Sequence, residues 1–394
     1  MNFDFDRIID RRTSDSLKWG KYAGSDLDVI PLWVADMDFA SPPAVLEALH
    51  QRVAHGVFGY AAPQPSLTRA LQEHLLREYR WQVEADWLVW LPGLVSGLNV
   101  ACRAVGDAGD EVLTATPIYP PFLSAPGHAQ RRVVGVPLAL GADGWKWDFA
   151  ALARAVTPAT KLLLLCHPHN PVGRAWCTGE LQQIAAFAER HKLIVCSDEI
   201  HCGLILDPGV KHQPFASLSA DAARRSITLM APSKTFNIPG LGCAFAVISD
   251  GALRRAFRTA MQGIVPHVNL LGFAATEAAL SSASDWHAAL LDYLRGNRDC
   301  VEQQIGQIPG LSMSHVEATY LAWIDARELC RTRGISNPQR FFEQAGVGLS
   351  DGAAFSPVAG RQPGPTSGFV RLNFGCPRPL LNQALERMRN ALLK

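Results

Sequence analysis

The stretch "SITLMAPSKTFNIPG", from Ser226 to Gly240, is the part of the sequence that decides which fold we predict. Its first five residues read as a buried β-strand, and Lys234 follows in the turn, between two hydroxyl side chains. Burial favours the neutral amine over the ammonium, so a lysine at the end of a buried strand is unusual. The setting suits a lysine that loses its proton and forms a covalent bond. Taken alone, however, such a lysine is more often a solvated loop residue.

The sequence around this stretch alternates short apolar runs with helical patterns. Strands are expected at 87–91, 111–115, 131–136, 161–166, 193–197, 226–230 and 243–248, and helices at about 65–80, 94–105, 178–191 and 251–262. This alternation is typical of an α/β fold with a mostly parallel sheet. Strands that are apolar throughout are usually covered by helices on both faces.

The length of the chain, 394 residues, predicts two domains. After about residue 285 a long amphipathic stretch leads to the spaced strands "YLAWI" and "FVRLNF" and to a terminal helix from about residue 380. We expect a large domain from residues 46–284 and a smaller α+β domain from residues 1–45 and 285–394. The stretches "PLWVADMDFASPP" and "SDGAAFSPVAGRQPGPTSG" are expected to be loops near the cleft between them.

The composition is that of a soluble globular enzyme, with 48% hydrophobic and 19% charged residues. A net charge of +1 favours neither a nucleic acid nor a membrane as partner. The start of the chain, "MNFDFDRIIDRRTSD", lacks the apolar stretch of a signal peptide. Nine cysteines without a CxxC pair suit a reducing cytoplasm, and their spacing predicts no metal site. We therefore expect a cytoplasmic protein that acts on a small molecule.

Three expected strands end next to residues with reactive side chains. Asn170 follows one strand in "CHPHNPVG", Asp198 ends the next in "SDEIH", and Lys234 follows the third. In an open α/β sheet, ligands bind in the crevice outside the carboxyl ends of the strands. We therefore expect an amide, a carboxylate and an amine to face one crevice.

These residue types suit pyridoxal 5′-phosphate. A neutral lysine can condense with its aldehyde, and an aspartate can hold a proton on its ring nitrogen so that the ring accepts electrons. Asn170 can donate a hydrogen bond to the phenolate oxygen of the cofactor. The phosphate requires backbone N–H groups at a helix start, which "LPGLVSGLN" supplies through Leu94 and Val95.

Five motifs occur in an order and spacing that resemble a known family: "PLWVADMDF", "HPHNPVG", "SDEIH", "SKTFNIPGLG" and "GFVRLNFGCPR". Together they resemble the fold type I pyridoxal-phosphate enzymes, and within them the class I/II aminotransferase family. The chain looks most similar to the branch that holds the cystathionine β-lyases, or C–S lyases. The resemblance covers almost the whole chain and implies the fold of aspartate aminotransferase-like enzymes.

The resemblance implies roles for particular residues. The catalytic residues would be Lys234, which carries the cofactor and moves protons, Asp198, which pairs with the pyridinium, and Tyr119, which stacks on the ring. The cofactor-binding residues would be Leu94, Val95, Tyr119, Asn170, Asp198, His201, Ser233 and Lys234, with Tyr60 reaching the phosphate of the neighbouring subunit. The substrate-binding residues would be Ala35, Asn170 and Arg371. A shared site of this kind implies a homodimer.

The sequence departs from the aminotransferase pattern at three positions. His201 stands where many aminotransferases carry a tyrosine, and its position fits a cofactor neighbour and a core histidine about equally. Gly242 stands where many have an arginine for the phosphate, and Ala231 lacks a hydroxyl. These departures resemble the C–S lyase branch. The tryptophans are expected to serve packing, although Trp33 lies near the expected substrate loop, and His167 and His169 are expected to be structural.

The resemblance implies a lyase that cleaves cystathionine or a related cysteine S-conjugate to a thiol, pyruvate and ammonia. An aminotransferase is the close alternative, because both reactions share every step through the Cα carbanion and no single residue separates them. A third hypothesis is a regulatory protein that binds a transcription factor. The complete set of cofactor residues argues against a purely binding role.

Overall fold

A seven-stranded sheet forms the centre of the protein. The structure is a computed structural model that describes residues 3–141, 144–357 and 364–393. In spatial order the strands are β2 (Leu88–Leu91), β10 (Ala244–Val247), β9 (Ser226–Met230), β8 (Ile194–Asp198), β7 (Thr160–Cys166), β3 (Glu111–Thr116) and β4 (Arg132–Pro137). The pairings from β9 to β4 are parallel, and β10 runs antiparallel to both of its neighbours. The predicted α/β fold with a mostly parallel sheet is confirmed.

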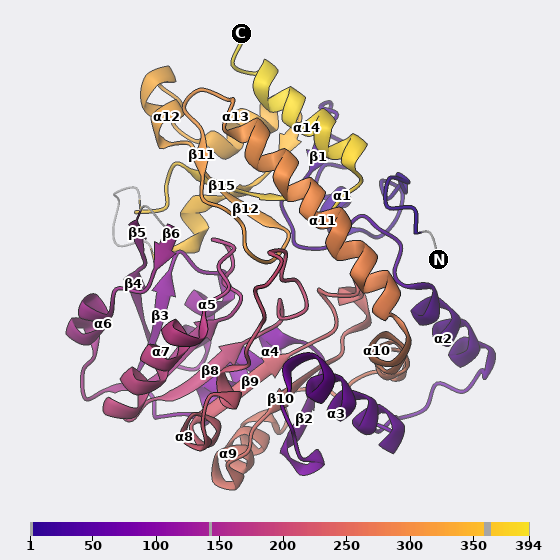
Figure 1. Cartoon of the computed structure of the whole chain (residues 1–394), viewed down its shortest axis with the longest axis vertical. Helices are drawn as coiled ribbons and strands as arrows, with labels where there is room; N and C mark the ends of the chain where they lie inside the picture. Colours follow the sequence, from indigo (N-terminus) through magenta and orange to yellow (C-terminus); the bar gives the residue numbers. More distant parts are fainter. Residues whose placement is uncertain (1–2, 142–143, 358–363, 394) are drawn as a thin grey trace.

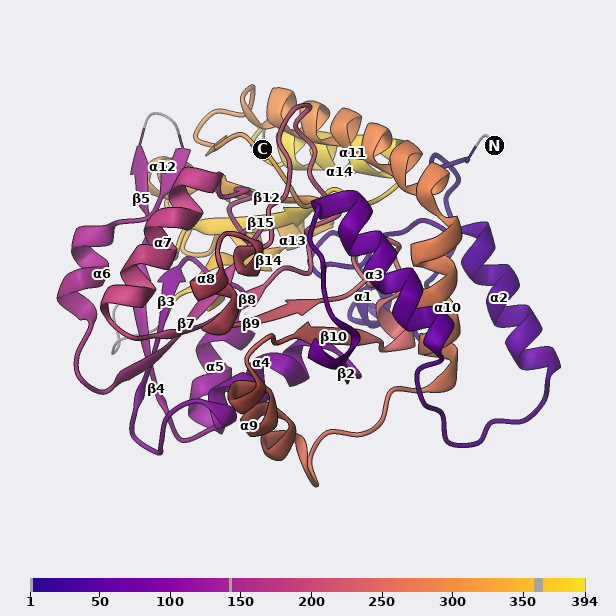
Figure 2. The same cartoon turned by 60° about the horizontal axis from the view of Figure 1, so that its bottom comes forward.

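Helices cover both faces of this sheet, as Figures 1 and 2 show. One face packs against α4 (Leu94–Ala104), α5 (Pro121–His128) and α9 (Gly251–Met261), and the other against α6 (Phe149–Ala155), α7 (Thr178–Arg190) and α8 (Ala220–Arg224). Strand β7 explains why: Leu162 and Leu164 join the first core, whereas Leu163 joins the second. Successive side chains of a strand point to opposite faces, so an apolar run must be covered twice.

Three helices pack together beyond the β2 end of the sheet. They are α2 (Pro43–Ala54), α3 (Pro65–Tyr79) and α10 (Leu270–Ser282), and α10 contacts both of the others. They lie side by side in Figure 2. From them the long helix α11 (Ser284–Ile305) leads to the C-terminal part of the chain. Each of α2 and α3 has a proline at its start. The first N–H groups of a helix have no partner within the helix, so the N–H that proline lacks is not needed there.

The C-terminal part contains a second, antiparallel sheet (Figure 1). Its strands, in spatial order, are β11 (Ser312–Met313), β12 (Leu321–Asp325), β15 (Phe369–Asn373) and β14 (Ser350–Asp351). Helices α11 and α14 (Arg378–Asn390) pack together beside it, and α12 (Arg327–Arg333) and α13 (Pro338–Gln344) complete this part. The N-terminal segment, with α1 (Leu17–Gly20), joins it through β1 (Ile30–Pro31), which pairs with β13 (Val347–Gly348).

The remaining elements are short. They are the hairpin of β5 (Ala139–Gly141) and β6 (Gly144–Lys146) and four 3-10 helices, Ala85–Trp87, Phe215–Ser217, Pro239–Leu241 and Gly352–Phe355. Two of the short elements correct an expectation, because β14 and the last 3-10 helix lie where the sequence predicts a loop from Ser350. Strand β15 supplies the hydrogen-bond partners of β14, and local sequence does not reveal a partner so far along the chain. Residues 358–363 of that expected loop lie outside the described residues.

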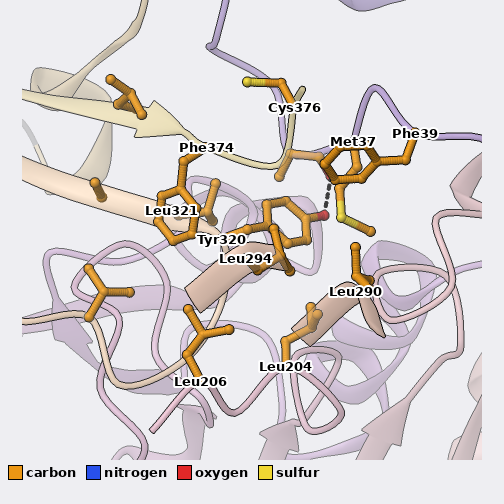
Figure 3. Packing of buried hydrophobic residues seen from close by; sticks show 14 of the residues in the cluster. Met37, Phe39, Leu204, Leu206, Leu290, Leu294, Tyr320, Leu321, Phe374 and Cys376 are labelled. Carbon is orange, nitrogen blue, oxygen red and sulfur yellow. Dashed lines mark hydrogen bonds between the residues drawn. The ribbon is translucent and has the colours of Figure 1, made fainter. Parts of the chain in front are cut away.

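A continuous apolar core joins the two parts of the molecule and positions the segment 31–39. Tyr320 is fully buried in this core, next to Met37, Leu294 and Phe374 (Figure 3). Its hydroxyl donates a hydrogen bond of 2.9 Å to the backbone oxygen of Ala35. The core therefore fixes the backbone that faces Lys234. Within the described residues, no helix is long and apolar enough to cross a membrane.

Candidate active site

A cavity of about 640 Å³ opens at the carboxyl ends of β3, β7, β8 and β9. All but one of the site residues predicted from the sequence line it: Ala35, Leu94, Val95, Tyr119, Asn170, Asp198, His201, Ser233, Lys234 and Arg371. The exception is Tyr60. Because β7, β8 and β9 are adjacent parallel strands, their carboxyl ends deliver Asn170, Asp198 and Lys234 to the same edge of the sheet.

Lys234 lies four residues beyond the end of β9, with its amine shielded from bulk solvent. Its Nζ donates a hydrogen bond of 2.5 Å to the backbone oxygen of Ala35. Within the described residues, Lys234 has no carboxylate at ion-pair distance. Burial lowers its pKa to about 8, against the weaker opposing effects of Asp36 and Asp198. About a tenth of this amine is therefore neutral, and nucleophilic, at pH 7, far more than for an ordinary lysine.

Asp198 is the last residue of β8, and its carboxylate faces the cavity. Its Oδ1 accepts a hydrogen bond of 3.2 Å from the backbone N–H of Ile200. Burial raises the pKa of Asp198 to about 7, and the neighbouring Glu199 carboxylate adds to the shift. An acid in this state gains most from a cation, such as a protonated ring nitrogen, placed beside it.

Glu199 points away from the cavity, as expected of a structural residue. Its Oε1 accepts hydrogen bonds from Ser197 Oγ at 2.7 Å and from the backbone N–H of Phe215 at 2.9 Å. Its Oε2 lies 2.7 Å from Nε2 of the buried His212. The two adjacent acids of "SDEIH" thus serve opposite sides of β8.

Arg371 and Asn170 lie together in the wall of the cavity. Arg371 is buried in β15 and donates hydrogen bonds to Asn170 Oδ1 at 3.0 Å and to the backbone oxygen of Trp33 at 2.9 Å. Its Nε is buried without a hydrogen-bond partner in the described part of the chain. Burial lowers the pKa of Arg371 to about 10, so it is charged at neutral pH. A fixed, incompletely paired guanidinium of this kind suits a carboxylate ligand.

His201 is neutral and incompletely hydrogen-bonded. It is buried, its Nδ1 has no hydrogen-bond partner among the residues that the structure describes, and its ring lies 6.1 Å from that of Tyr320. Burial, with the positive charges of Lys234 and Arg371, lowers its pKa to about 3. Burial also raises the pKa of Tyr119, which follows β3 and keeps its proton.

The end of the cavity beside α4 fits a phosphate through backbone groups. Gly93, Leu94 and Val95 line it at the N-terminus of this 11-residue helix, where free N–H groups and the helix dipole favour an anion. Gly242, at the position where many aminotransferases have arginine, has φ of +55°, and a Cβ there would lie 3.2 Å from the backbone oxygen of Pro92. The backbone conformation thus favours glycine.

The cations that line the cavity within the described residues are Lys21, Lys234 and Arg371. None of them is on α4 or beside it in the sequence. An amine of lowered pKa, a buried acid and an anion-binding helix start together fit pyridoxal 5′-phosphate.

Tyr60 lies apart from this cavity. Tyr60 is fully exposed, and the neighbouring side chains of Val57 and Phe58 are each more than half exposed. Its predicted role in the site of a neighbouring subunit therefore stays a prediction.

The sequence analysis missed several residues of the cavity. Trp33 lines it, although packing was expected of the tryptophans. Lys21, Gln339, Asp351 and Phe355 line it as well. Asp351 and Phe355 lie in a glycine-rich stretch that was expected near the cleft, which was a weak signal. Lys21 and Gln339 had no signal, because tertiary contacts alone bring them to the site.

Comparisons with known proteins agree with this arrangement. The model of the family described as aminotransferase class I and II matches residues 28–388. The cystathionine beta-lyase PatB of Bacillus subtilis (strain 168) is 34% identical over 397 residues, covering 99% of this chain and 100% of PatB.

Two solved structures have closely similar folds. The crystal structure of a protein named OvoB has a TM-score of 0.93 and 48% identity, and covers 99% of both chains. The PLP-bound C–S lyase from Staphylococcus hominis has a TM-score of 0.91 and 30% identity, covering 100% of this chain and 99% of its own. The similarity thus extends over both parts of the molecule.

Proposed function

The chain belongs to the aminotransferase class I and II family, and from this premise we propose that it is a pyridoxal-phosphate-dependent carbon–sulfur β-lyase. The observation that carries the proposal is the convergence of Lys234, Asp198 and Arg371 on one cavity, in a chain similar over its full length to enzymes named cystathionine β-lyase and C–S lyase. Its substrate would be cystathionine or a related cysteine S-conjugate. The products would be a thiol, pyruvate and ammonia.

We propose that the cofactor is held by the residues at the strand ends and at α4. Lys234 would hold the cofactor covalently, Asp198 would face the ring nitrogen, and Tyr119 would cover the ring. Asn170 and His201 would face the ring oxygen, while Ser233, Leu94 and Val95 would bind the phosphate. Pyridoxal phosphate, when bound, supplies an electron sink for the electron pair that remains on the substrate Cα after its proton has left.

Arg371 would bind the α-carboxylate of the substrate. Its guanidinium is held by Asn170 and Trp33, so it is oriented before the substrate arrives. The backbone amide of Ala35 would assist, on the segment that Tyr320 fixes from behind. This clamp would orient the Cα–H bond toward Lys234.

Lys234 would remove the Cα proton. Its lowered pKa of about 8 leaves a useful fraction of the amine neutral, and a base whose pKa lies near the working pH transfers protons efficiently. The Cβ–S bond then breaks, its electron pair leaves with the sulfur, and the thiolate takes up a proton. The remaining three-carbon fragment takes up water and becomes pyruvate and ammonia.

We also propose a cytoplasmic homodimer with shared sites and two domains, of residues 46–284 and of residues 1–45 with 285–394. The exposed apolar segment of Val57, Phe58 and Tyr60 supports an interface, since such side chains gain from burial against a second copy. The pairing of β1 with β13 supports the grouping of the N-terminal segment with the C-terminal part.

The experiment is an incubation of the purified holoenzyme with cystathionine while pyruvate and free thiol are measured together. The lyase releases the two in equal amounts without any added 2-oxo acid. An aminotransferase would instead need a 2-oxo acid and would release no thiol, and that result would overturn the proposal.

A further inference from the structure

The outer end of the cavity is lined by side chains that the β-elimination itself does not use. Three of them, Lys21, Gln339 and Asp351, are called the outer group here. They come from three places in the chain: the residue after α1, helix α13 and strand β14. The outer group is half-buried or exposed, whereas Arg371 at the inner wall is buried. It therefore lies nearer to bulk solvent than Arg371, the proposed site of the substrate α-carboxylate.

Asp351 is held in place but keeps its charge unpaired. Its neighbour in β14, Ser350, lies opposite Arg371 in the sheet and accepts a hydrogen bond from it at 3.3 Å. The two carboxylate oxygens of Asp351 accept hydrogen bonds from the backbone N–H of Ala353 and from Asn337 Nδ2, both at 2.9 Å. Both donors are neutral, and Asp351 has no ion pair within the described residues.

Lys21 supplies the opposite charge. Its Nζ lies 5.1 Å from the centre of the Trp33 ring, which also lines the cavity, and donates a 2.9 Å hydrogen bond to Tyr22 Oη. The distance from Lys21 Nζ to Glu343 Oε2 is 3.5 Å. The same Oε2 accepts shorter hydrogen bonds from Tyr22 Oη at 3.0 Å and from Gln339 Nε2 at 2.6 Å. An ammonium has three N–H donors, so Lys21 can take a further anionic partner.

We infer that the outer group recognises a leaving thiol that itself ends in an amino acid, with Asp351 taking its ammonium and Lys21 its carboxylate. This inference rests on the proposed lyase function and names the class of substrate for it. A plain S-alkyl conjugate would place apolar atoms beside both charges and gain nothing from them. An amino-acid thiol satisfies both, and charge-assisted hydrogen bonds contribute more to binding than neutral ones.

Four conjugates separate the two charges. Cystathionine carries both on its leaving thiol, S-(2-aminoethyl)cysteine only the ammonium, S-(2-carboxyethyl)cysteine only the carboxylate, and S-ethylcysteine neither. The holoenzyme and its Lys21→Met and Asp351→Asn variants are compared by thiol release. The exposed Lys161, which lies outside the cavity, gives the matched control Lys161→Met.

The expected result is selective. Lys21→Met lowers kcat/KM about five- to tenfold for the two conjugates whose leaving thiol carries a carboxylate. Asp351→Asn does the same for the two whose leaving thiol carries an ammonium. Both losses arise mainly through KM. The rate with S-ethylcysteine stays unchanged in both variants, which shows that each is folded. Equal losses with all four conjugates, or no loss with any, would overturn the inference.

Binding separates this inference from the proposed function. The same four conjugates are titrated calorimetrically into the Lys234→Ala protein, with and without each outer-group substitution. If binding still depends on the distal charges while the wild-type enzyme releases no thiol, then the lyase assignment is wrong and the proposed role of the outer group is supported. If thiol is released but binding does not depend on the distal charges, the proposed role of the outer group is wrong and the lyase assignment is supported.

Discussion

Lys18 is buried and Lys234 is half-buried in the cavity wall, and the two lysines lie in opposite electrostatic settings. The Nζ of Lys18 is 2.6 Å from Asp38, which Arg11 also contacts at 2.7 Å. Burial favours the neutral form of Asp38, but the Lys18 ammonium, the Trp19 N–H and Arg11 hold its pKa below the ordinary value. This acid stays charged, and Lys18 holds the N-terminal segment together.

Lys234 has no carboxylate partner of this kind among residues 3–141, 144–357 and 364–393. Its Nζ bonds to a backbone carbonyl, and burial lowers its pKa to about 8, while the pKa of Asp198 rises to about 7. A lysine and an aspartate in contact stabilise each other's charges, whereas the same residue types held apart in a cavity remain ready for a ligand. Whether a buried lysine is structural or reactive thus depends on the distance to its nearest carboxylate.

The strongest test of this comparison is Lys234→Ala. We expect thiol release from cystathionine to fall at least about 1,000-fold, because both the covalent anchor and the base are lost. Borohydride reduction of the wild-type holoenzyme should add the mass of the cofactor to the chain, and the variant should show no such addition. Covalent labelling of the variant at another lysine would contradict the assignment.

Asp198→Asn should have the next largest effect. An amide cannot stabilise a protonated ring nitrogen by charge, so we expect kcat to fall about 100-fold or more. The amide retains an acceptor for the backbone N–H of Ile200, so the fold should be preserved. Steady-state kinetics together with the absorption spectrum of the bound cofactor check this. An unchanged kcat would show that the charge of Asp198 is not used.

Lys18→Met should affect stability instead of chemistry. Removal of one partner of a buried ion pair leaves the other charge uncompensated, and we expect the free energy of unfolding to fall by about 3 kcal/mol. Urea unfolding measures this loss, and kcat per folded molecule should stay near that of the wild type. A large loss of kcat without a loss of stability would reverse the roles of the two lysines.

The pH dependence of cofactor capture should show the smallest but most specific effect. Below a pKa of about 8 most of the Lys234 amine is protonated and cannot attack an aldehyde. The rate at which the apoprotein binds pyridoxal phosphate covalently should therefore rise about tenfold per pH unit and level off above about pH 8. Lys18→Met should leave this profile unchanged. A profile that levels off only near the ordinary lysine value of 10.5 would show that burial does not tune Lys234.

The strand ends were predictable because their signals are local. Asn170, Asp198 and Lys234 each follow an apolar run, and the alternation of strands and helices implies parallel strands with their carboxyl ends at one edge. The sheet confirms this adjacency. The outer group was not predictable, since Lys21 and Asp351 are more than 300 residues apart and neither adjoins an apolar run that marks a strand end.

The sequence by itself therefore determined the α/β fold, the family and which side chains lie at the strand ends, because apolar periodicity and motif spacing act over short distances along the chain. Only the tertiary structure decided which buried lysine is paired and what surrounds the outer end of the cavity. Both depend on contacts between distant segments, such as β14 with β15 and the Tyr320 hydroxyl with Ala35. Such contacts arise when the whole core packs, and no local pattern encodes them.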